Sequence, residues 1–500
     1  MRHRLLAHAR ELGRGRTAGR RGAARVLSRG GQEPLDVACR FPEAVTHLKG
    51  RSAWLRRREH LLDGEAGLLA EVALHVFGVI RAIHVHGRQS LSTCSGSWGR
   101  RGIVVTVTFG GRDAASGAQL ICDVGHAEAL APEWDALAVG CGAPTSCPAW
   151  MLAWWRHLAP ASAALRLIAV RRDGELIGVL PFYVDSASRS TERVYRLLAD
   201  DFSPRVMPVG RPDRIWETAQ AAAGLLGRPE LRPDRIELGP TPADTPWPVA
   251  LREGWPEAIR PFAYRGELLM APTVWLKHRS FDDWLAERGP RFRANLRRYR
   301  RLFEEAGGTY RLATPATVAS DIDTFAELHA RRWDGRNSRL VAAGDRLAPF
   351  LEDVAASLLA ENRLRLLVLE IEGKPICADL WLAAGGELTG INAGWDERYK
   401  WLSPPQLALV HTLEDACARG DHRLNLGWGT LDYKRKYTSG AFAISWEVLL
   451  PPGPQLARTV PRALPAIAAR RLAATVKRAL PEAHVARLRA ARARAADWSR

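Results

Sequence analysis

Two short segments in the second half of the chain hold residues that could move protons. Asp396 follows an apolar run, and it could act as a general base or simply cap the loop that it opens. Tyr433 and Lys434 follow the stretch Gly427-Trp428-Gly429. A lysine there could bind a phosphate or carboxylate or position an acyl group, and a tyrosine could protonate a leaving thiolate. The further basic residues behind Lys434 equally fit a solvent-facing basic loop.

A helix start between these segments could hold an anion. Ser403-Pro404 begins a helix predicted over Pro404–Arg419. The N–H groups in the first turn of a helix have no partner within the helix, and the helix dipole favours negative charge there. The alternative is a helix that is simply started by Ser-Pro-Pro. The candidate anion site consists of Ser403, Pro404, Gln406 and Leu407.

Other side chains are candidates for binding a substrate. Arg332 could clamp an anionic acceptor or be an ordinary structural arginine, and some of the 18 tryptophans could stack on sugar rings. The candidate substrate residues are Arg332, Trp333, Tyr399 and Trp428. Glu370, Glu372 and Asp379 lie on a predicted hairpin and are interpreted as surface or structural groups. No G-x-S-x-G motif or similar nucleophile signature occurs, so no covalent enzyme intermediate is expected.

The elements that must position these residues follow from hydrophobic patterning. Apolar runs separated by glycine turns predict three antiparallel strands, Leu364–Ile371, Pro375–Ala384 and Glu387–Gly394. The helix Pro404–Arg419 follows, and then strands Leu424–Trp428 and Phe442–Leu450. After the helix, the strand from Leu424 can pair only in parallel with its neighbour. The junction over Gly394–Gln406 is therefore expected to point backbone N–H groups into a cleft.

The hairpin at the start of this unit occurs twice. The segment Leu165–Val170, followed by Asp173-Gly174, matches Leu364–Leu369, followed by Glu372-Gly373, at a constant offset of 199 residues. Each copy follows helical segments with tryptophan. The repeat predicts a duplicated α+β unit, although any two apolar hairpins resemble each other to some degree.

The motifs together resemble the CelD/BcsL-type acetyltransferases, which belong to the GNAT superfamily and are named for cellulose biosynthesis. The resemblance rests on the segment Asn392–Tyr399, on Ser403-Pro404 with its helix, and on Leu426–Gly429 leading to Tyr433-Lys434. The stretch His329–Trp333 and the entry to the first half are similar too. The resemblance covers residues 126–450 and implies two tandem GNAT-like units, as in FemAB-type transferases. Each unit would have a mixed, mostly antiparallel sheet flanked by helices.

The resemblance also implies an activity. The expected donor is acetyl-CoA or another acyl-CoA, without a metal, and the expected acceptor is an amine or hydroxyl, such as a glycan of exopolysaccharide or cell-envelope metabolism. The chain departs from the family in one place, because the family suggests glycine at position 405 and Pro405 stands there. Proline removes one N–H from the anion site.

The distribution of charge along the chain predicts the domain boundaries, and the cysteines predict the compartment. Of the net charge of +18, residues 1–125 carry 20 basic and 10 acidic side chains, and residues 451–500 carry 11 and 2. We expect a poorly ordered basic extension over 1–125, two units over 126–270 and 271–455, and a basic amphipathic helical tail over 456–500 that could touch a membrane surface. Seven scattered cysteines without C-x-x-C favour a reducing cytoplasm and no zinc site, and no apolar run predicts a membrane span.

Two other functions stay open. Seven arginines between Arg288 and Arg301 fit either a solvated helix face or a surface that binds a phosphate-bearing donor, a lipid-linked sugar or RNA. A FemAB-like transferase that uses aminoacyl-tRNA would suit this helix and the basic ends. A degenerate GNAT pair that serves as a binding or scaffolding module would suit Pro405.

Overall fold

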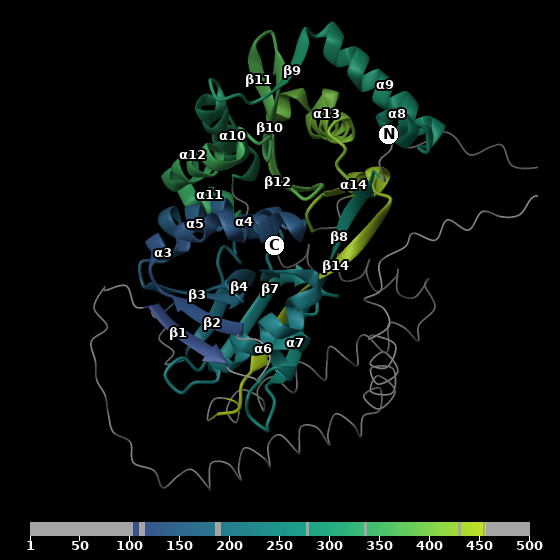
Figure 1. Ribbon diagram of the computed structural model, residues 1–500. Coiled ribbons are helices and arrows are strands. Elements are labelled where there is room, and N and C mark those ends of the chain that lie inside the picture. Colours follow the sequence, from purple (N-terminus) through teal and green to yellow (C-terminus); the bar gives the residue numbers. More distant parts are fainter. Residues whose placement is uncertain are drawn as a thin grey trace, which may run out of the picture. The chain divides into compact units, whose positions relative to one another are not determined.

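The computed structural model describes residues 104–109, 116–185, 192–276, 280–334, 338–428, 432–453 and 456, with the backbone alone at 104–109, 116, 432 and 433. The elements are labelled in Figure 1. Those of the first half are β1 (Val104–Phe109), β2 (Ser116–Ile121), α3 (Val124–Ala129), α4 (Ala131–Gly140), η1 (Pro144–Ser146), α5 (Pro148–His157), β3 (Ala163–Arg172), β4 (Glu175–Asp185), β5 (Val194–Leu197), β6 (Val209–Gly210), η2 (Pro212–Arg214), α6 (Ile215–Leu226), β7 (Arg235–Pro242), α7 (Trp247–Glu253) and β8 (Phe262–Trp275). Those of the second half are α8 (Phe281–Ala286), α9 (Pro290–Glu305), β9 (Gly308–Leu312), α10 (Val318–Trp333), α11 (Arg339–Ala343), η3 (Gly344–Arg346), α12 (Leu347–Leu358), β10 (Leu364–Ile371), β11 (Lys374–Ala384), β12 (Glu387–Trp395), η4 (Glu397–Leu402), α13 (Pro404–Ala418), β13 (Arg423–Asn425), α14 (Asp432–Tyr437) and β14 (Gly440–Leu450).

The repeated hairpin has the same register in both halves. Leu165 pairs with Tyr183 in β3–β4, and Leu364 pairs with Leu382 in β10–β11, again 199 residues further on. Both pairs of strands change register at the same place, after Val170 and after Leu369. In both turns the two central residues have positive φ, which is the geometry of a type I′ hairpin. The duplication therefore extends to backbone detail that apolar composition alone would not produce.

Each half also has one parallel pair of strands joined across a helix. β5 pairs in parallel with β7 across α6, and β12 pairs in parallel with β13 across α13, as the order of elements predicts for the second half. In the second half, α10 and α12 lie on one side of β10–β12, and α13 lies on the other (Figure 1). Alternate side chains of β11 serve both faces: Leu380 packs toward α10 and α12, and Trp381 packs toward α13.

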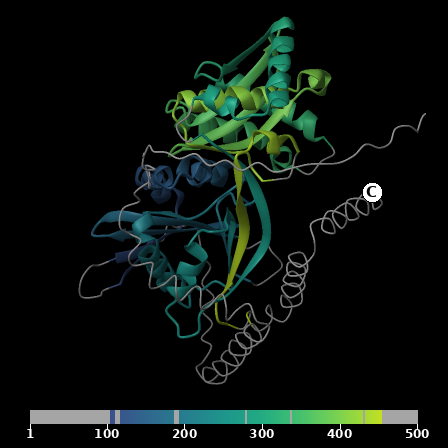
Figure 2. The same cartoon turned by 90° about the vertical axis from the view of Figure 1, so that its right-hand side faces the viewer.

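The two halves exchange their last strands. Figure 2 shows β8 and β14 running side by side as a long ribbon, and they pair from Phe262 with Leu450 to Thr273 with Gly440. β8 follows the first half in sequence but pairs with β13 of the second half, whereas β14 follows the second half and pairs with β7 of the first. The described strands therefore form one sheet of 14 strands, in which the ribbon is the seam between the halves.

The structure differs from the expected boundaries in two places. The boundary between residues 270 and 271 falls inside β8, because the exchanged strand belongs to both halves. Residues 1–125 were expected to be a poorly ordered extension, but β1 and β2 lie within them and pair with each other and with β3. The rest of residues 1–115 and the expected tail over 456–500, apart from Leu456, lie outside the described residues.

A buried charged cluster joins the halves beside the ribbon. Arg205 of the first half, 4% exposed, makes an ion pair of 2.8 Å with Glu387 of β12, which is 3% exposed. Arg423 of β13 contacts the same carboxylate and lies over the Trp275 ring at 5.1 Å. A buried carboxylate that is shared by two guanidinium groups fixes how the first half meets the strands of the second.

The contact between β12 and α10 gives a first testable prediction. A Cβ added at Gly394 would overlap the backbone of Leu328 and His329, so only glycine lets this strand lie against the helix. We expect Gly394→Ala to lower the free energy of unfolding by about 2–3 kcal/mol. Chemical denaturation measures this change. Gly140→Ala is the matched control, because no atom lies within 4 Å of its added Cβ, and the prediction is contradicted if both variants unfold alike.

Candidate active site

The parallel strands β12 and β13 separate soon after they begin to pair. They pair at three positions, of which Thr389 with Asn425 is the last. On its other edge β12 is irregular, because Leu380 pairs with Asn392 and Trp381 pairs with Gly390, so Ile391 is left without an opposite residue. An extra residue of this kind bends and twists a strand. β12 then continues to Trp395 beyond the end of β13, and its free edge could receive an extended ligand.

A buried carboxyl group lies next to this point. Asp379 of β11 pairs with Ala393 of β12 and is only 6% exposed. It lies between Cys377 and Trp381 on the face of the sheet that α13 covers, so its carboxyl group is placed among apolar side chains. Burial raises the pKa of Asp379 to about 7, while the Trp381 indole and the Lys434 ammonium act to lower it.

Lys434 of α14 reaches the end of β13, and its charge interacts with that of Asp379. Its Nζ donates a hydrogen bond of 2.6 Å to the backbone oxygen of Leu426, directly after β13. Burial lowers the pKa of Lys434 to about 8, and the charge of Asp379 acts to raise it. An acid and a base that interact and both titrate near neutrality are typical of catalytic groups. The charges of Lys434 and Asp379 therefore influence each other, whereas the ion pair of Asp396 is with Arg398.

Asp379 was interpreted from the sequence as a surface or structural group, and this interpretation missed its position. The available signal was its place in the strand. It stands between two apolar residues that share its face, so any residue there must be buried. The repeat adds a second signal, because the residue 199 positions earlier is Leu180, which is fully buried.

Asp396 does not have the geometry of the expected general base. Its carboxylate accepts a hydrogen bond of 3.0 Å from the backbone N–H of Arg398, and it forms an ion pair of 2.6 Å with the same residue's guanidinium. These donors hold the pKa of Asp396 below its usual value. A carboxylate that is saturated with donors is a poor proton acceptor, so Asp396 caps η4, which is the alternative that its sequence position also allows.

The start of α13 is not the expected anion site either. Pro404 and Pro405 have no N–H, and the N–H groups of both Gln406 and Leu407 donate to the backbone oxygen of Ser403. The Ser403 N–H donates to Lys400, and its hydroxyl accepts from the Gln406 side chain at 2.6 Å. Of the described residues in this first turn, none therefore offers a backbone N–H to a pyrophosphate, and a cradle of such groups does not fit here.

The expected substrate residues lie on two sides of the separation. On the side of β12, the guanidinium of Arg332 lies 5.3 Å from the centre of the Trp395 ring and 3.3 Å from Glu397. Tyr399 packs in the same apolar cluster as Trp395, whereas Trp333 packs against His329 on α10. On the side of β13, Trp428 is 44% exposed. The side chain of Tyr433 lies outside the described residues.

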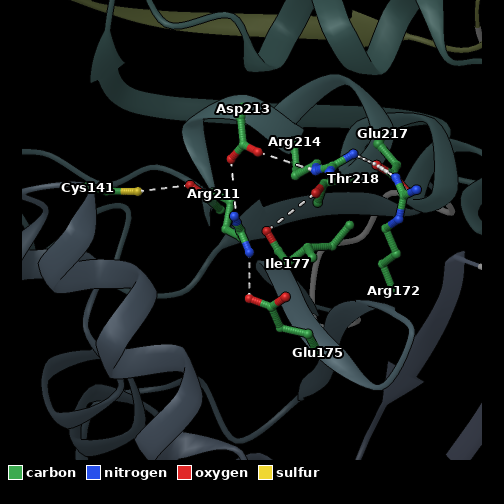
Figure 3. A network of polar contacts seen from close by, with 10 residues as sticks. Cys141, Arg172, Glu175, Ile177, Arg211, Asp213, Arg214, Glu217 and Thr218 are labelled. Atoms are coloured by element: carbon green, nitrogen blue, oxygen red, sulfur yellow. Dashed lines mark hydrogen bonds and ion pairs between the residues drawn. The ribbon is translucent and has the colours of Figure 1, made fainter. Parts of the chain in front are cut away.

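The corresponding helix start of the first half is covered by ion pairs (Figure 3). Arg211 pairs with Glu175 at 2.6 Å, and Glu217 in the first turn of α6 pairs with Arg172 at 2.9 Å. The loop after β5 contacts the second half, because the Phe202 ring packs against the Phe350 ring. With a leucine in place of Asp379 as well, the first half lacks the features that mark the candidate site, so the candidate site is in the second half.

One family match includes both Asp379 and Lys434. Residues 290–435 match a family described as an acetyltransferase (GNAT) domain. No curated protein matches the chain. Similar solved structures include FemX, at 13% identity over 63% of this chain and 95% of that one, with a TM-score of 0.45. Another is a conserved protein of unknown function from Bacteroides thetaiotaomicron, at 12% identity over 64% of this chain and 97% of that one, with a TM-score of 0.43. A third is a tandem GNAT protein from the clavulanic acid biosynthesis pathway, at 15% identity over 70% of this chain and 99% of that one, with a TM-score of 0.36.

The fold is a GNAT fold, an α+β architecture with a mixed sheet flanked by helices, as the sequence predicts. Within the second half, residues 290–435 are similar to GNAT acetyltransferase domains. The CelD/BcsL type stays a prediction. In the described ranges no group of side chains could hold a metal ion. Nor does any described helix have the length and apolar character that crossing a membrane requires.

Proposed function

We propose that the protein transfers an acyl group from a thioester, with acyl-CoA as the expected donor, to an amine or hydroxyl group of an acceptor. The observation that carries this proposal is the position of Lys434 at the end of β13, next to the separation of β12 and β13 and beside buried Asp379. The acceptor nitrogen or oxygen attacks the thioester carbonyl. The new bond forms as the carbon–sulfur bond breaks, and the proton of the acceptor ends on the thiol.

Lys434 and Asp379 have separate roles in this proposal. The Lys434 ammonium donates a hydrogen bond to the carbonyl oxygen, which becomes negative in the tetrahedral transition state. Asp379 is a positioning residue, because its carboxylate keeps Lys434 protonated near neutral pH. Because Asp379 must be ionised and Lys434 protonated, we expect the greatest activity between the two pKa values, at pH 7 to 8.

The acceptor is proposed to be a glycan of exopolysaccharide or cell-envelope metabolism, as the sequence resemblance implies. Two exposed tryptophans support this class of acceptor. Trp401, 53% exposed, lies on the segment after β12, and Trp428 lies after β13, so the two follow the strands that separate. Flat aromatic rings offer the apolar surface that a sugar ring needs for stacking.

The closed start of α13 favours a second candidate donor, aminoacyl-tRNA. A pyrophosphate there would have to be held by side chains, whereas a tRNA donor needs no such cradle, and exposed arginines of α9 suit its phosphates. Calorimetry with acetyl-CoA and a tRNA titration at several salt concentrations separate the donors. Saturable acetyl-CoA binding supports the proposal; salt-dependent tRNA binding alone supports the second candidate. If neither donor binds, the chain is a binding or scaffolding module.

Pro405 gives a prediction about the donor. We expect Pro405→Gly to tighten acetyl-CoA binding about five- to tenfold, because it adds a backbone N–H at the second helical position of α13. Calorimetry measures the affinity. Pro290→Gly at the start of α9 is the matched control, since it adds a backbone N–H at the start of a different helix. Equal affinities for all three proteins would show that no phosphate group of the donor approaches the start of α13.

A further inference from the structure

An apolar surface lies open beside the candidate site. On β8, alternate residues share one face of the sheet, and Val274 on that face is fully buried beneath α13. On the same face further along the strand, Leu268 and Met270 are 52% and 48% exposed. Exposed apolar side chains that adjoin one another form a contiguous patch, and such patches mark interaction sites when they are large.

Two tryptophans border the same surface. Trp446 of β14 adjoins β8, since its backbone and Cβ would meet a Cβ added at Gly266. Exposed Trp428 lies against Trp446, with ring centres 6.2 Å apart and the rings nearly perpendicular. We define the β8 surface by Leu268, Met270, Trp428 and Trp446. The Nζ of Lys434 donates a hydrogen bond to the backbone oxygen of Leu426, two residues before Trp428. This surface therefore lies next to the candidate site.

Basic side chains flank the β8 surface. α14 adjoins β8, because the backbone N–H of Ser439, two residues after α14, donates to the backbone oxygen of Thr273. The Tyr437 ring of α14 lies 5.0 Å from the Phe292 ring of α9. α9 buries Leu296 and Phe303, so the opposite side of this helix is exposed. Three arginines there, Arg291, Arg297 and Arg298, are exposed and make no ion pair with any residue that the structure describes.

We infer that the β8 surface and the three arginines of α9 form a docking surface for an anionic lipid bilayer. Leucine, methionine and tryptophan side chains enter the boundary between headgroups and acyl chains, and arginines contact lipid phosphates. A symmetric dimer through this face would place the arginines of one copy near those of the other, which charge repulsion opposes. Nucleic acid suits the arginines but gives Leu268 and Met270 no partner. The inference goes beyond the proposed activity and shares Trp428 with the proposed acceptor site, and it concerns a surface other than the basic C-terminal tail.

The experiment is flotation of the full-length protein with vesicles of phosphatidylcholine alone and of phosphatidylcholine mixed with phosphatidylglycerol. We expect binding to the mixed vesicles only. Leu268→Ser/Met270→Ser and Arg297→Glu/Arg298→Glu should each weaken it by at least about fivefold, since one basic residue near an anionic surface contributes about that factor. Val249→Ser on α7 is the control, because Val249 is 45% exposed in the first half and should change nothing.

Every outcome decides the inference. The basic ends of the chain are present in all variants, so their contribution cancels. Equal binding by wild type and both double variants would overturn the inference and assign any binding to other segments. No vesicle binding would overturn it as well, and sedimentation and tRNA titration would then show whether a second copy or a nucleic acid uses these residues. Circular dichroism and the thermal unfolding temperature confirm that the variants fold.

Discussion

Replacing Lys434 by methionine is expected to lower kcat at least about 100-fold, because one donor to a developing oxyanion contributes a factor of this size. The apolar stem of methionine fills the same half-buried space, so the thermal unfolding temperature should stay close to that of the wild type. Lys436→Met is the matched control, since Lys436 is on the same helix but exposed. Steady-state kinetics with a thioester donor measures the effect.

Two outcomes would contradict this role. Full activity of Lys434→Met would show that the ammonium does not touch the reacting carbonyl. A rise in KM with unchanged kcat would show that Lys434 only binds a substrate, for example through a phosphate or carboxylate. The first outcome would show that the candidate site is not the active site. The second would support the location of the site but assign Lys434 to substrate binding instead of catalysis.

Asp379→Asn is expected to change the pH profile of the reaction. The charge of Asp379 acts to raise the pKa of Lys434, which burial lowers to about 8. Without that charge the pKa of Lys434 falls further, so the alkaline decline of kcat should move below pH 8. We also expect kcat at pH 8 to fall at least about tenfold, because less Lys434 is protonated. A merely structural aspartate would leave the position of this decline unchanged.

The same variant should be more stable than the wild type in mild alkali. The folded-state pKa of Asp379, about 7, lies above its ordinary value of 3.8. Stability from this group is therefore fully present below pH 3.8 and is lost as the pH rises through 7, because the buried group must ionise. Asparagine does not ionise, so the unfolding temperature of Asp379→Asn should exceed that of the wild type at pH 8. A variant that is both slower and more stable identifies a functional residue.

Much of the second half could be predicted from its sequence. The strands predicted over Leu364–Ile371 and Glu387–Gly394 and the helix predicted from Pro404 match β10, β12 and α13 within a few residues. Periodicity, glycine turns and a proline at the start of a helix are local signals, and they suffice for local elements. The offset of 199 residues also led to the correct duplicated architecture, which the shared register of the two hairpins confirms.

The site itself was harder to predict, because its properties depend on hydrogen bonds and ion pairs that a pattern of residue types does not show. Asp396 was expected to be a base from its position after a strand, but a neighbouring arginine saturates it. Asp379 was set aside although its two apolar neighbours on the same face and its alignment with Leu180 indicate a buried position. The start of α13 lacks free N–H groups for two reasons. Proline has no N–H, and the N–H groups of Gln406 and Leu407 donate to the backbone oxygen of Ser403.

The exchange of β8 and β14 has a consequence for synthesis on the ribosome. Strand β7 is made early, but one of its partners, β14, is made after α14, near the end of the described chain. The backbone groups on this edge of β7 therefore stay unpaired while about 200 further residues are translated. Their translation takes on the order of ten seconds or more. Exposed edges of this kind invite pairing with other chains, so holdase chaperones should associate with nascent chains until residue 450 has emerged. For the same reason, a fragment that stops before Gly440 cannot complete the sheet of its first half.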